Sequence, residues 1–350
     1  MESKAVKNPM KRVFARFPFL ALFLGCAFSA RAFGGAVSTG ADKQNGQSAE
    51  VAASYQDRAY FLKDGASLSY SNPDFLKTMG SAPADFGGFI ADSFKKDKLP
   101  WLAAITASTL ILIEYDQKIY DNTRRFGERQ GVSSKDKTRT FLKIGGVSVL
   151  RGPTDAGSAM YFLGDGWVNL GLLGGFETYG WLKDDWRSRQ TGHQLAEGLI
   201  VTGFSTQVLK RVTGRETPRA STAPRGVWRF FPSFKDFQGH RTRYDAFPSG
   251  HLATCMMTLT IIAENYPEKK YIKPLGYSLL TLLSFQMVNN GVHWASDYPL
   301  GLAIGYGVGK AIARTGRTAA RRGLKSEAAL RLGPYLSADG FPGAALSLRF

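Results

Sequence analysis

The sequence predicts an all-α fold, a helical bundle of about six core helices followed by a small C-terminal β-hairpin. Two observations support this prediction. Between residues 99 and 315, apolar residues recur at three- and four-residue spacing in successive segments, which is the pattern of buried helix faces. After residue 326, apolar and polar residues alternate instead, and that pattern is typical of a strand.

The helical segments are apolar along one face and are separated by short turns. They cover residues 99–122, 157–182, 190–213, 249–265, 272–290 and 297–315. Charged residues interrupt or bound each segment, so none supplies the ~18 uncharged apolar residues of a clean membrane span. We therefore expect a globular bundle that rests on a membrane surface, in preference to an integral membrane protein. Glycines spaced by four residues, at 301, 305 and 309, favour close helix packing in either setting.

The C-terminal segment 326–350 is expected to form the hairpin. Two stretches, Leu330–Ser337 and Ala344–Phe350, flank residues rich in glycine, proline and aspartate. Alternate residues of the second stretch are apolar, as in a strand with one covered face.

The first 32 residues have the three parts of a secretory signal peptide. Basic residues precede the apolar run Phe17–Ala30, and the small residues Ala30 and Ala32 then offer a cleavage site. The run of about 14 residues is shorter than the roughly 20 that span a bilayer, so we expect export to the periplasm or cell envelope. A retained membrane anchor and a lipoprotein attached through Cys26 are the alternatives.

The chain is thus expected to have four parts. Residues 1–32 are the signal peptide, and residues 33–98 lack clear periodicity and predict a poorly structured N-terminal segment. Residues 99–320 form the helical domain, and residues 326–350 form the hairpin. After signal cleavage Cys255 is the remaining thiol, so no intramolecular disulfide is expected.

The chain is strongly basic, with 45 lysines and arginines against 28 acidic residues and a net charge of +17. Such a charge attracts nucleic acids, anionic lipid headgroups and phosphorylated small molecules. Export argues against nucleic acid as a partner. A phosphorylated lipid or another anionic envelope substrate, together with a membrane surface, is therefore the expected partner.

A long segment without helical periodicity, 214–247, interleaves arginines with aromatic residues. Connections of this length are usually functional or disordered, and the aromatic content argues against disorder. The segment predicts a lid that contacts an amphipathic anionic substrate. A long solvated connection with a few anchoring aromatics is the alternative.

The sequence Pro248-Ser249-Gly250-His251 precedes one of the expected helices. The first backbone N–H groups of a helix have no acceptor within it, and the helix dipole adds partial positive charge there. Such a helix start binds anions. Gly250 allows close approach of the backbone, Ser249 adds a hydroxyl donor, and His251 follows directly.

His293 lies four residues before Asp297, and Pro299 then marks the first turn of another expected helix. Asp297 is placed to accept a proton from one imidazole nitrogen, which makes the other nitrogen a better nucleophile. An aspartate that caps the helix beside an incidental histidine is the alternative for this pair taken alone.

Taken together, these motifs resemble a known family. Lys210 with Pro218, the 248–251 motif, and His293 with Asp297 resemble the three-part signature of the type 2 phosphatidic acid phosphatase and haloperoxidase superfamily. The resemblance covers roughly residues 99 to 315.

This resemblance implies a set of roles. His293 would be the nucleophile that takes the phosphoryl group as a phosphohistidine, and Asp297 would orient it. His251 would protonate the leaving alkoxide and later help to activate water. Three groups would hold the phosphoryl oxygens: Lys210, Ser249 and the backbone amide of Gly250. No metal ion or other cofactor is implied for phosphatase action.

The chain departs from the family signature at two positions. The first motif of the family is Lys, six residues, Arg, Pro, and here Thr217 stands where that arginine is expected. The third motif begins with Ser-Arg, where this chain has Gln286 and Met287. Neither residue offers the bidentate charged fork of arginine. Nearby arginines could replace it: Arg215 or Arg219 on one side, and Arg241 or Arg243 on the other.

We expect an active but altered site, because the nucleophile, its aspartate, the acid and the lysine are all present. The expected function is an exported phosphatase of the acid phosphatase type. It would hydrolyse a phosphomonoester or pyrophosphate of a lipid-linked or other envelope substrate. The alternatives are a catalytically impaired envelope protein that binds anionic lipid, and a vanadate-dependent haloperoxidase.

Overall fold

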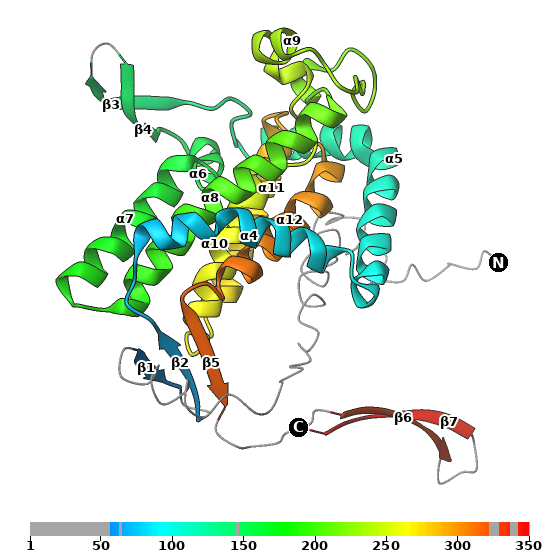
Figure 1. Ribbon diagram of the computed structural model, residues 1–350. Helices are drawn as coiled ribbons and strands as arrows, with labels where there is room; N and C mark the ends of the chain where they lie inside the picture. Colours follow the sequence, from blue (N-terminus) through cyan, green and yellow to red (C-terminus); the bar gives the residue numbers. More distant parts are fainter. Residues whose placement is uncertain (1–56, 63–64, 145–146, 322–328, 337–341, 350) are drawn as a thin grey trace.

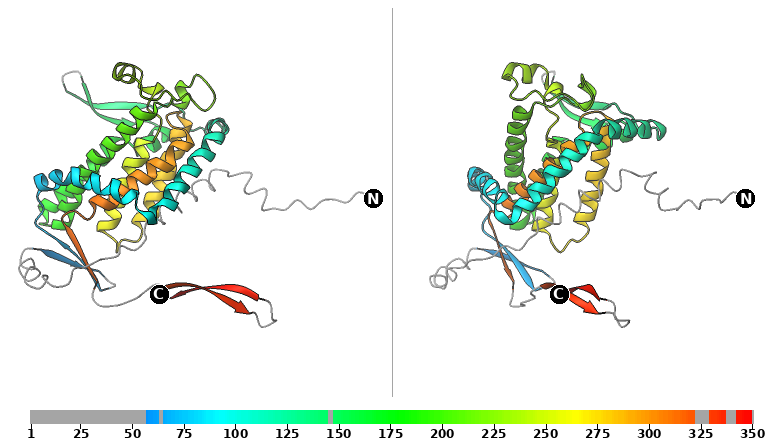
Figure 2. Two further views of the ribbon diagram at one scale, coloured as in Figure 1. Left: turned by 45° about the vertical axis from the view of Figure 1, so that its right-hand side comes forward. Right: turned by 90° about the vertical axis from the view of Figure 1, so that its right-hand side faces the viewer.

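The computed structural model describes residues 57–62, 65–144, 147–321, 329–336 and 342–349. These residues form a mostly helical molecule with small sheets (Figure 1). The left-hand view in Figure 2 shows α5, α12 and α8 running nearly parallel. No helix within the described ranges has the length and apolarity needed to cross a membrane.

Each expected helical segment corresponds to helices of the structure. Within residues 99–320, the expected helical domain, the α-helices are α5 (Leu99–Arg129), α6 (Ala156–Phe162), α7 (Gly166–Leu182), α8 (Trp186–Thr213), α9 (Phe234–Gly239), α10 (Gly250–Asn265), α11 (Ile272–Asn289) and α12 (Tyr298–Ile312). The expected segment 157–182 is divided between α6 and α7. Short 3-10 turns are η1 (Lys96–Lys98), η2 (Pro218–Ala220), η3 (Arg241–Arg243) and η4 (Ala295–Asp297).

The expectation of an all-α fold is wrong in detail, because the chain also forms strands that the sequence analysis did not predict. Strands β1 (Arg58–Phe61), β2 (Ala66–Tyr70) and β5 (Arg317–Arg321) make an antiparallel sheet. Strands β3 (Thr138–Ile144) and β4 (Val147–Pro153) make a separate hairpin. The strands are short, and β2 pairs with a segment from the far end of the helical region, so local periodicity does not reveal them.

The segment expected to be poorly structured is ordered over its second half. Residues 57–98 contain β1, β2, η1 and helix α4 (Phe75–Ser93). Helix α4 packs against α8 and α12, so tertiary contacts stabilise a segment whose own periodicity is weak. The expected signal peptide, like all residues up to 56, lies outside the described residues.

The expected C-terminal hairpin is confirmed in the residues that are described. Strands β6 (Ala329–Leu336) and β7 (Pro342–Arg349) pair antiparallel, with Ala329 opposite Arg349.

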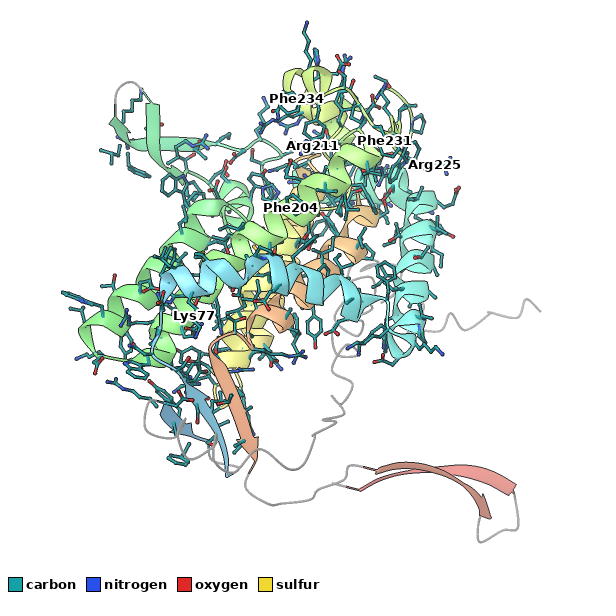
Figure 3. The ribbon with its side chains drawn as sticks, viewed as in Figure 1. Lys77, Phe204, Arg211, Arg225, Phe231 and Phe234 are labelled. Carbon is teal, nitrogen blue, oxygen red and sulfur yellow. The ribbon has the colours of Figure 1, made fainter. Side chains whose placement is uncertain are left out.

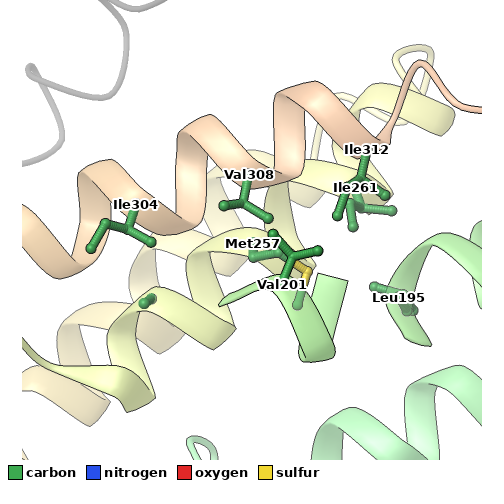
Figure 4. Close-up of a cluster of buried hydrophobic side chains, with 8 residues drawn as sticks. Leu195, Val201, Met257, Ile261, Ile304, Val308 and Ile312 are labelled. Atoms are coloured by element: carbon green, nitrogen blue, oxygen red, sulfur yellow. The ribbon is translucent and has the colours of Figure 1, made fainter. Parts of the chain in front are cut away.

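The core lies between α8, α10 and α12. Helix α8 buries residues on nearly every turn, while Phe204 stands on its exposed side (Figure 3). Apolar side chains from the three helices form one buried cluster (Figure 4). Its members are Leu195, Val201, Ala253, Met257, Ile261, Ile304, Val308 and Ile312. A second cluster joins α10 to α11, and together the two clusters fix the position of the α10 N-terminus.

The glycine ladder of α12 lies against α10. A Cβ at Gly301 would lie 2.6 Å from the carbonyl oxygen of Ser249, and one at Gly305 would lie 2.1 Å from that of Ala253. Gly309 faces the side chain of Thr260 at similarly short distance. The absence of side chains therefore lets α12 approach the backbone of α10, as the spacing predicts.

Replacing Gly305 with alanine should lower the free energy of unfolding by about 1–3 kcal/mol, because the added methyl group overlaps the Ala253 carbonyl. The matched control is Gly203→Ala in α8, where a Cβ would meet nothing within 4 Å. That variant should gain up to about 1 kcal/mol from helix propensity. Denaturant titrations of both variants measure the difference, and equal stabilities would contradict close α10–α12 packing.

Candidate active site

Two histidines from separate segments meet at the N-terminus of α10. His251 lies in the first turn of α10, and His293 lies in the turn between α11 and η4. Their ring centroids are 5.8 Å apart, with an interplanar angle of 73°. The structure therefore brings together the two histidines that the sequence singled out.

The hydrogen bonds of His293 to the described residues involve Nδ1 and leave Nε2 without a partner among them. Nδ1 lies 2.8 Å from the carbonyl oxygen of Ala246, and a carbonyl can only accept, so Nδ1 carries the proton. Oδ2 of Asp297 lies farther from Nδ1, at 3.4 Å. The lone pair of Nε2 is then available for attack on an electrophile.

The expected role of Asp297 is therefore shared with a residue that the sequence analysis missed. Ala246 provides the closer acceptor for His293, while Asp297 is held by the backbone N–H of Trp294 at 2.8 Å. A backbone carbonyl carries no signature in the sequence, because every residue has one.

His251 has a partner that the sequence analysis also missed. Nε2 of His251 lies 3.3 Å from the hydroxyl of Tyr161, and the two ring centroids are 5.2 Å apart. Burial raises the pKa of Tyr161 to about 12, so its hydroxyl keeps its proton. Tyr161 belongs to α6, far from either histidine motif in sequence, and no spacing signal links it to them.

Both histidines are neutral in this environment. Burial is the main cause that lowers the pKa of each imidazole to about 3. For His251, repulsion between two protonated rings would lower the pKa further, and for His293 the charge of Lys210 does so. A neutral His293 keeps the lone pair that a nucleophile needs. His251 can act as an acid only after it gains a proton, and a bound phosphate dianion would favour that gain.

Lys210 lies beside the start of α10. Its Nζ would lie 3.9 Å from a Cβ built on Gly250, so the ammonium group and the helix amides face the same space. Burial lowers the pKa of Lys210, and the charges of Asp245 and Asp297 oppose that shift. Lys210 and Gly250 are thus brought together as expected.

Ser249 is the N-cap of α10 and is fully buried. Its hydroxyl accepts the N–H of Leu252, and its own N–H donates to the carbonyl of Asp297 at 3.0 Å. This bond ties the anion-binding helix start directly to the segment of His293. The Ser249 side chain therefore serves the helix cap, and the role in phosphate binding that the resemblance implies for it stays a prediction.

The two positions where the family signature has arginine hold uncharged buried side chains. Thr217 is buried, and its N–H donates to the carbonyl of Thr242. Met287 is fully buried in the α10–α11 cluster, and its sulfur lies 3.9 Å from Oγ of Ser249. Apolar packing thus replaces a charged fork beside the helix start.

Arg215 is fully buried and cannot substitute for a phosphate clamp as it stands. Its guanidinium donates to Asp297 and Ser296 at 2.6 Å and to Asp116 at 2.7 Å. Burial raises the pKa of Asp297 to about 6, and the Arg215 charge limits that rise. The expectation that Arg215 binds phosphate is therefore corrected: it holds the carboxylates beneath the site.

The other three arginines lie outside this buried network. Arg219 is exposed. Burial raises the pKa of Tyr161, and the charge of Arg219 opposes that rise, so Arg219 lies within electrostatic range of Tyr161. Arg241 is also exposed. Burial lowers the pKa of Lys210 and the charge of Arg241 lowers it further, so Arg241 lies within electrostatic range of Lys210. Arg243 is exposed and makes no hydrogen bond or ion pair with the described site residues.

Asp245 is a further charged group near the site. It is partly buried, and its charge opposes the lowering of the pKa of both Lys210 and His293. A carboxylate here repels a phosphate dianion and attracts the surrounding cations. The sequence analysis did not select it, because aspartates at loop ends are common.

Comparison with known proteins agrees with this geometry. A family model described as the PAP2 superfamily matches residues 192–321, which include Lys210, His251, His293 and Asp297. Tyr161 and Asp116 lie outside the matched residues. No curated protein and no solved structure matches the chain.

Replacing Arg215 with methionine should lower the free energy of unfolding by about 3–5 kcal/mol, because two buried carboxylates lose their partner. Arg219→Met is the control, since an exposed arginine contributes within about 0.5 kcal/mol. Chemical denaturation followed by circular dichroism measures both. Similar losses in the two variants would contradict a structural role for the Arg215 network.

Histidine NMR of the 15N-labelled protein should show neutral rings for His251 and His293 from about pH 8 down to about pH 5, below the usual value of about 6.5. Because their folded-state pKa values are lowered, the unfolded chain binds more protons in this window, and stability falls as the pH falls below about 6.5. A titration of either ring near pH 6.5 would contradict their burial.

Proposed function

Because residues 192–321 form a domain of the PAP2 superfamily, whose members are typically phosphatases, we propose that this chain is an exported phosphatase. It hydrolyses a phosphomonoester or pyrophosphate of a lipid-linked or other envelope substrate through a phosphohistidine intermediate. The observation that carries the proposal is the pair of neutral histidines at the start of α10, with Nε2 of His293 free.

The first half of the reaction transfers the phosphoryl group to the protein. The Nε2 lone pair of His293 attacks phosphorus and forms a P–N bond, while the P–O bond to the leaving group breaks. The leaving oxygen keeps that electron pair and takes a proton from His251, which the bound phosphate dianion has brought to its charged form. Lys210 and the amides at the start of α10 stabilise the equatorial oxygens.

The second half restores the site. A water molecule attacks phosphorus and gives a proton to His251, while the P–N bond breaks and its electron pair returns to Nε2 of His293. Inorganic phosphate leaves, and both imidazoles regain the state in which they began the transfer. Throughout both steps, Nδ1 of His293 keeps its proton and donates it in a hydrogen bond to the Ala246 carbonyl.

An apolar cavity supports a substrate with a lipid leaving group. The cavity has a volume of about 260 Å³ and lies between α7, α10 and α11, with Leu163, Cys255 and Leu283 in its lining. Gly164 packs between the lining residue Leu283 and His251, because a Cβ there would lie 2.9 Å from Leu283 and 3.2 Å from His251. Apolar space is therefore present on the side of His251, the residue that protonates the leaving group.

A second candidate, an envelope protein that binds anionic lipid without catalysis, is favoured by the buried Thr217 and Met287. Loss of both clamping arginines removes stabilisation of the transition state but leaves the lysine and helix amides for binding. Turnover and binding measured on the same protein separate the two candidates.

His293→Ala should abolish phosphate release from phosphatidic acid, a polyprenyl diphosphate and an aryl phosphate, because no nucleophile remains. His240→Ala, an exposed histidine outside the site, is the control and should retain activity. His251→Ala should slow the alkyl substrate far more than the aryl phosphate, whose leaving group needs less protonation. General acid catalysis of this kind contributes about 10²–10⁴-fold.

Free phosphate is measured colorimetrically for each protein and substrate. If wild type and His293→Ala release phosphate at the same rate from all three substrates, the phosphatase proposal fails. Retained lipid binding in His293→Ala would then support the second candidate.

A further inference from the structure

Three phenylalanines project from the segment that follows the site lysine. Phe230, Phe231 and Phe234 are 63%, 74% and 73% exposed, although they lie within five residues of one another. Figure 3 shows Phe231 and Phe234 at the end of the molecule that also carries Arg211. We refer to the three as the phenylalanine tip. A cluster of exposed aromatics marks an interaction surface more often than a solvated loop.

The backbone beneath the phenylalanine tip is held firmly on α8. The N–H of Arg229 donates to the carbonyl of Gly214 at 2.9 Å, and that of Phe231 donates to Val212 at 3.1 Å. On the other side, Phe237 is 2% exposed and anchors α9 to the body of the molecule. The phenyl rings are therefore presented from an ordered support.

Phe231 also has an unusual backbone conformation. Its φ of +53° lies in the left-handed region, which side chains with a Cβ rarely adopt. The bond to Val212 holds it there, and the exposed ring gains no packing in return. Strain of this kind that serves no internal packing points to a function outside the molecule.

Cations surround the phenylalanine tip. Residues 211–243 contain eight basic and two acidic residues. Five of the basic side chains form no ion pair with any carboxylate in the described part of the chain: Arg211, Arg219, Lys235, Arg241 and Arg243. The acidic Asp236 accepts instead from the hydroxyl of Ser233. The surface is therefore both aromatic and positively charged.

The same segment reaches the active site at its other end. The N–H of Thr217 donates to the carbonyl of Thr242, and the carbonyl of Ala246 accepts from Nδ1 of His293. The segment that carries the phenylalanine tip therefore also supports His293.

We propose that the phenylalanine tip and its surrounding cations dock the protein onto an anionic lipid bilayer, with the site facing that bilayer. Phenyl rings enter the boundary between headgroups and acyl chains, and lysine and arginine side chains bind the headgroup phosphates. Charge complementarity and the projecting aromatics fit a bilayer, which needs no matching pocket. This docking goes beyond the proposed phosphatase activity and does not depend on it.

The test is co-sedimentation of the full chain with vesicles, carried out in the His293→Ala background so that no lipid is hydrolysed. Vesicles of phosphatidylcholine alone are compared with vesicles made of an equimolar mixture of phosphatidylcholine and phosphatidylglycerol. We expect binding to the anionic vesicles, weakening as salt is raised, and little binding to the neutral ones. Equal binding to both vesicles, or to neither, would overturn the proposal.

Two pairs of variants locate the surface. Phe231→Ser with Phe234→Ser should weaken binding at least about tenfold. The control, Phe61→Ser with Leu76→Ser, removes two exposed apolar side chains from β1 and α4 and should bind as before. Lys235→Gln with Arg243→Gln should also weaken binding. Its control, in the α10–α11 turn, is Lys269→Gln with Lys270→Gln.

Thermal unfolding of every variant checks that the fold is retained. If a control variant loses as much vesicle binding as the tip variant that it is matched to, the assignment of the surface is overturned. Retained binding in both tip variants would also overturn it, because another face of the molecule would then contact the vesicles.

Discussion

The buried guanidinium of Arg215 holds together the segments on which the site depends. It binds Asp116 on α5, Asp297 in η4 and the carbonyl of Arg225 in the long connecting segment, and both carboxylates are shielded from solvent. Charges buried in this way are tolerated only as a satisfied set, because removing one partner leaves the others unpaired. The position of Asp297, and through the Ser249 N–H the start of α10, therefore depends on one arginine.

This arrangement gives the site a particular electrostatic character. Arg215, two residues before the position where the family signature has arginine, is committed to structure, and Thr217 and Met287 supply no charge. Stabilisation of an oxyanion is left to Lys210 and the helix amides, with Asp245 acting against them. The histidines are neutral because of burial, so the anion that binds must itself supply the field that charges His251.

The segment 214–247 links the two surfaces of the molecule that concern function. At its ends, Arg215 and Ala246 build the support of the catalytic histidines. At its middle, the phenylalanine tip faces solvent on an ordered backbone. If the proposed docking holds, a lipid substrate would reach the proposed active site without passing fully into water.

The sequence by itself determined the helices and singled out the two histidines that are proposed to be catalytic. Apolar periodicity is local, so segments such as 190–213 and 249–265 were predicted to within a few residues, and His251 and His293 stand in short motifs with a chemical rationale. Only the tertiary structure decided the partners: Ala246 for His293, Tyr161 for His251, Asp116 for Arg215, and β5 for β2. These contacts join residues distant along the chain, and a carbonyl, a tyrosine or a short strand carries no periodic or spacing signal that predicts its partner.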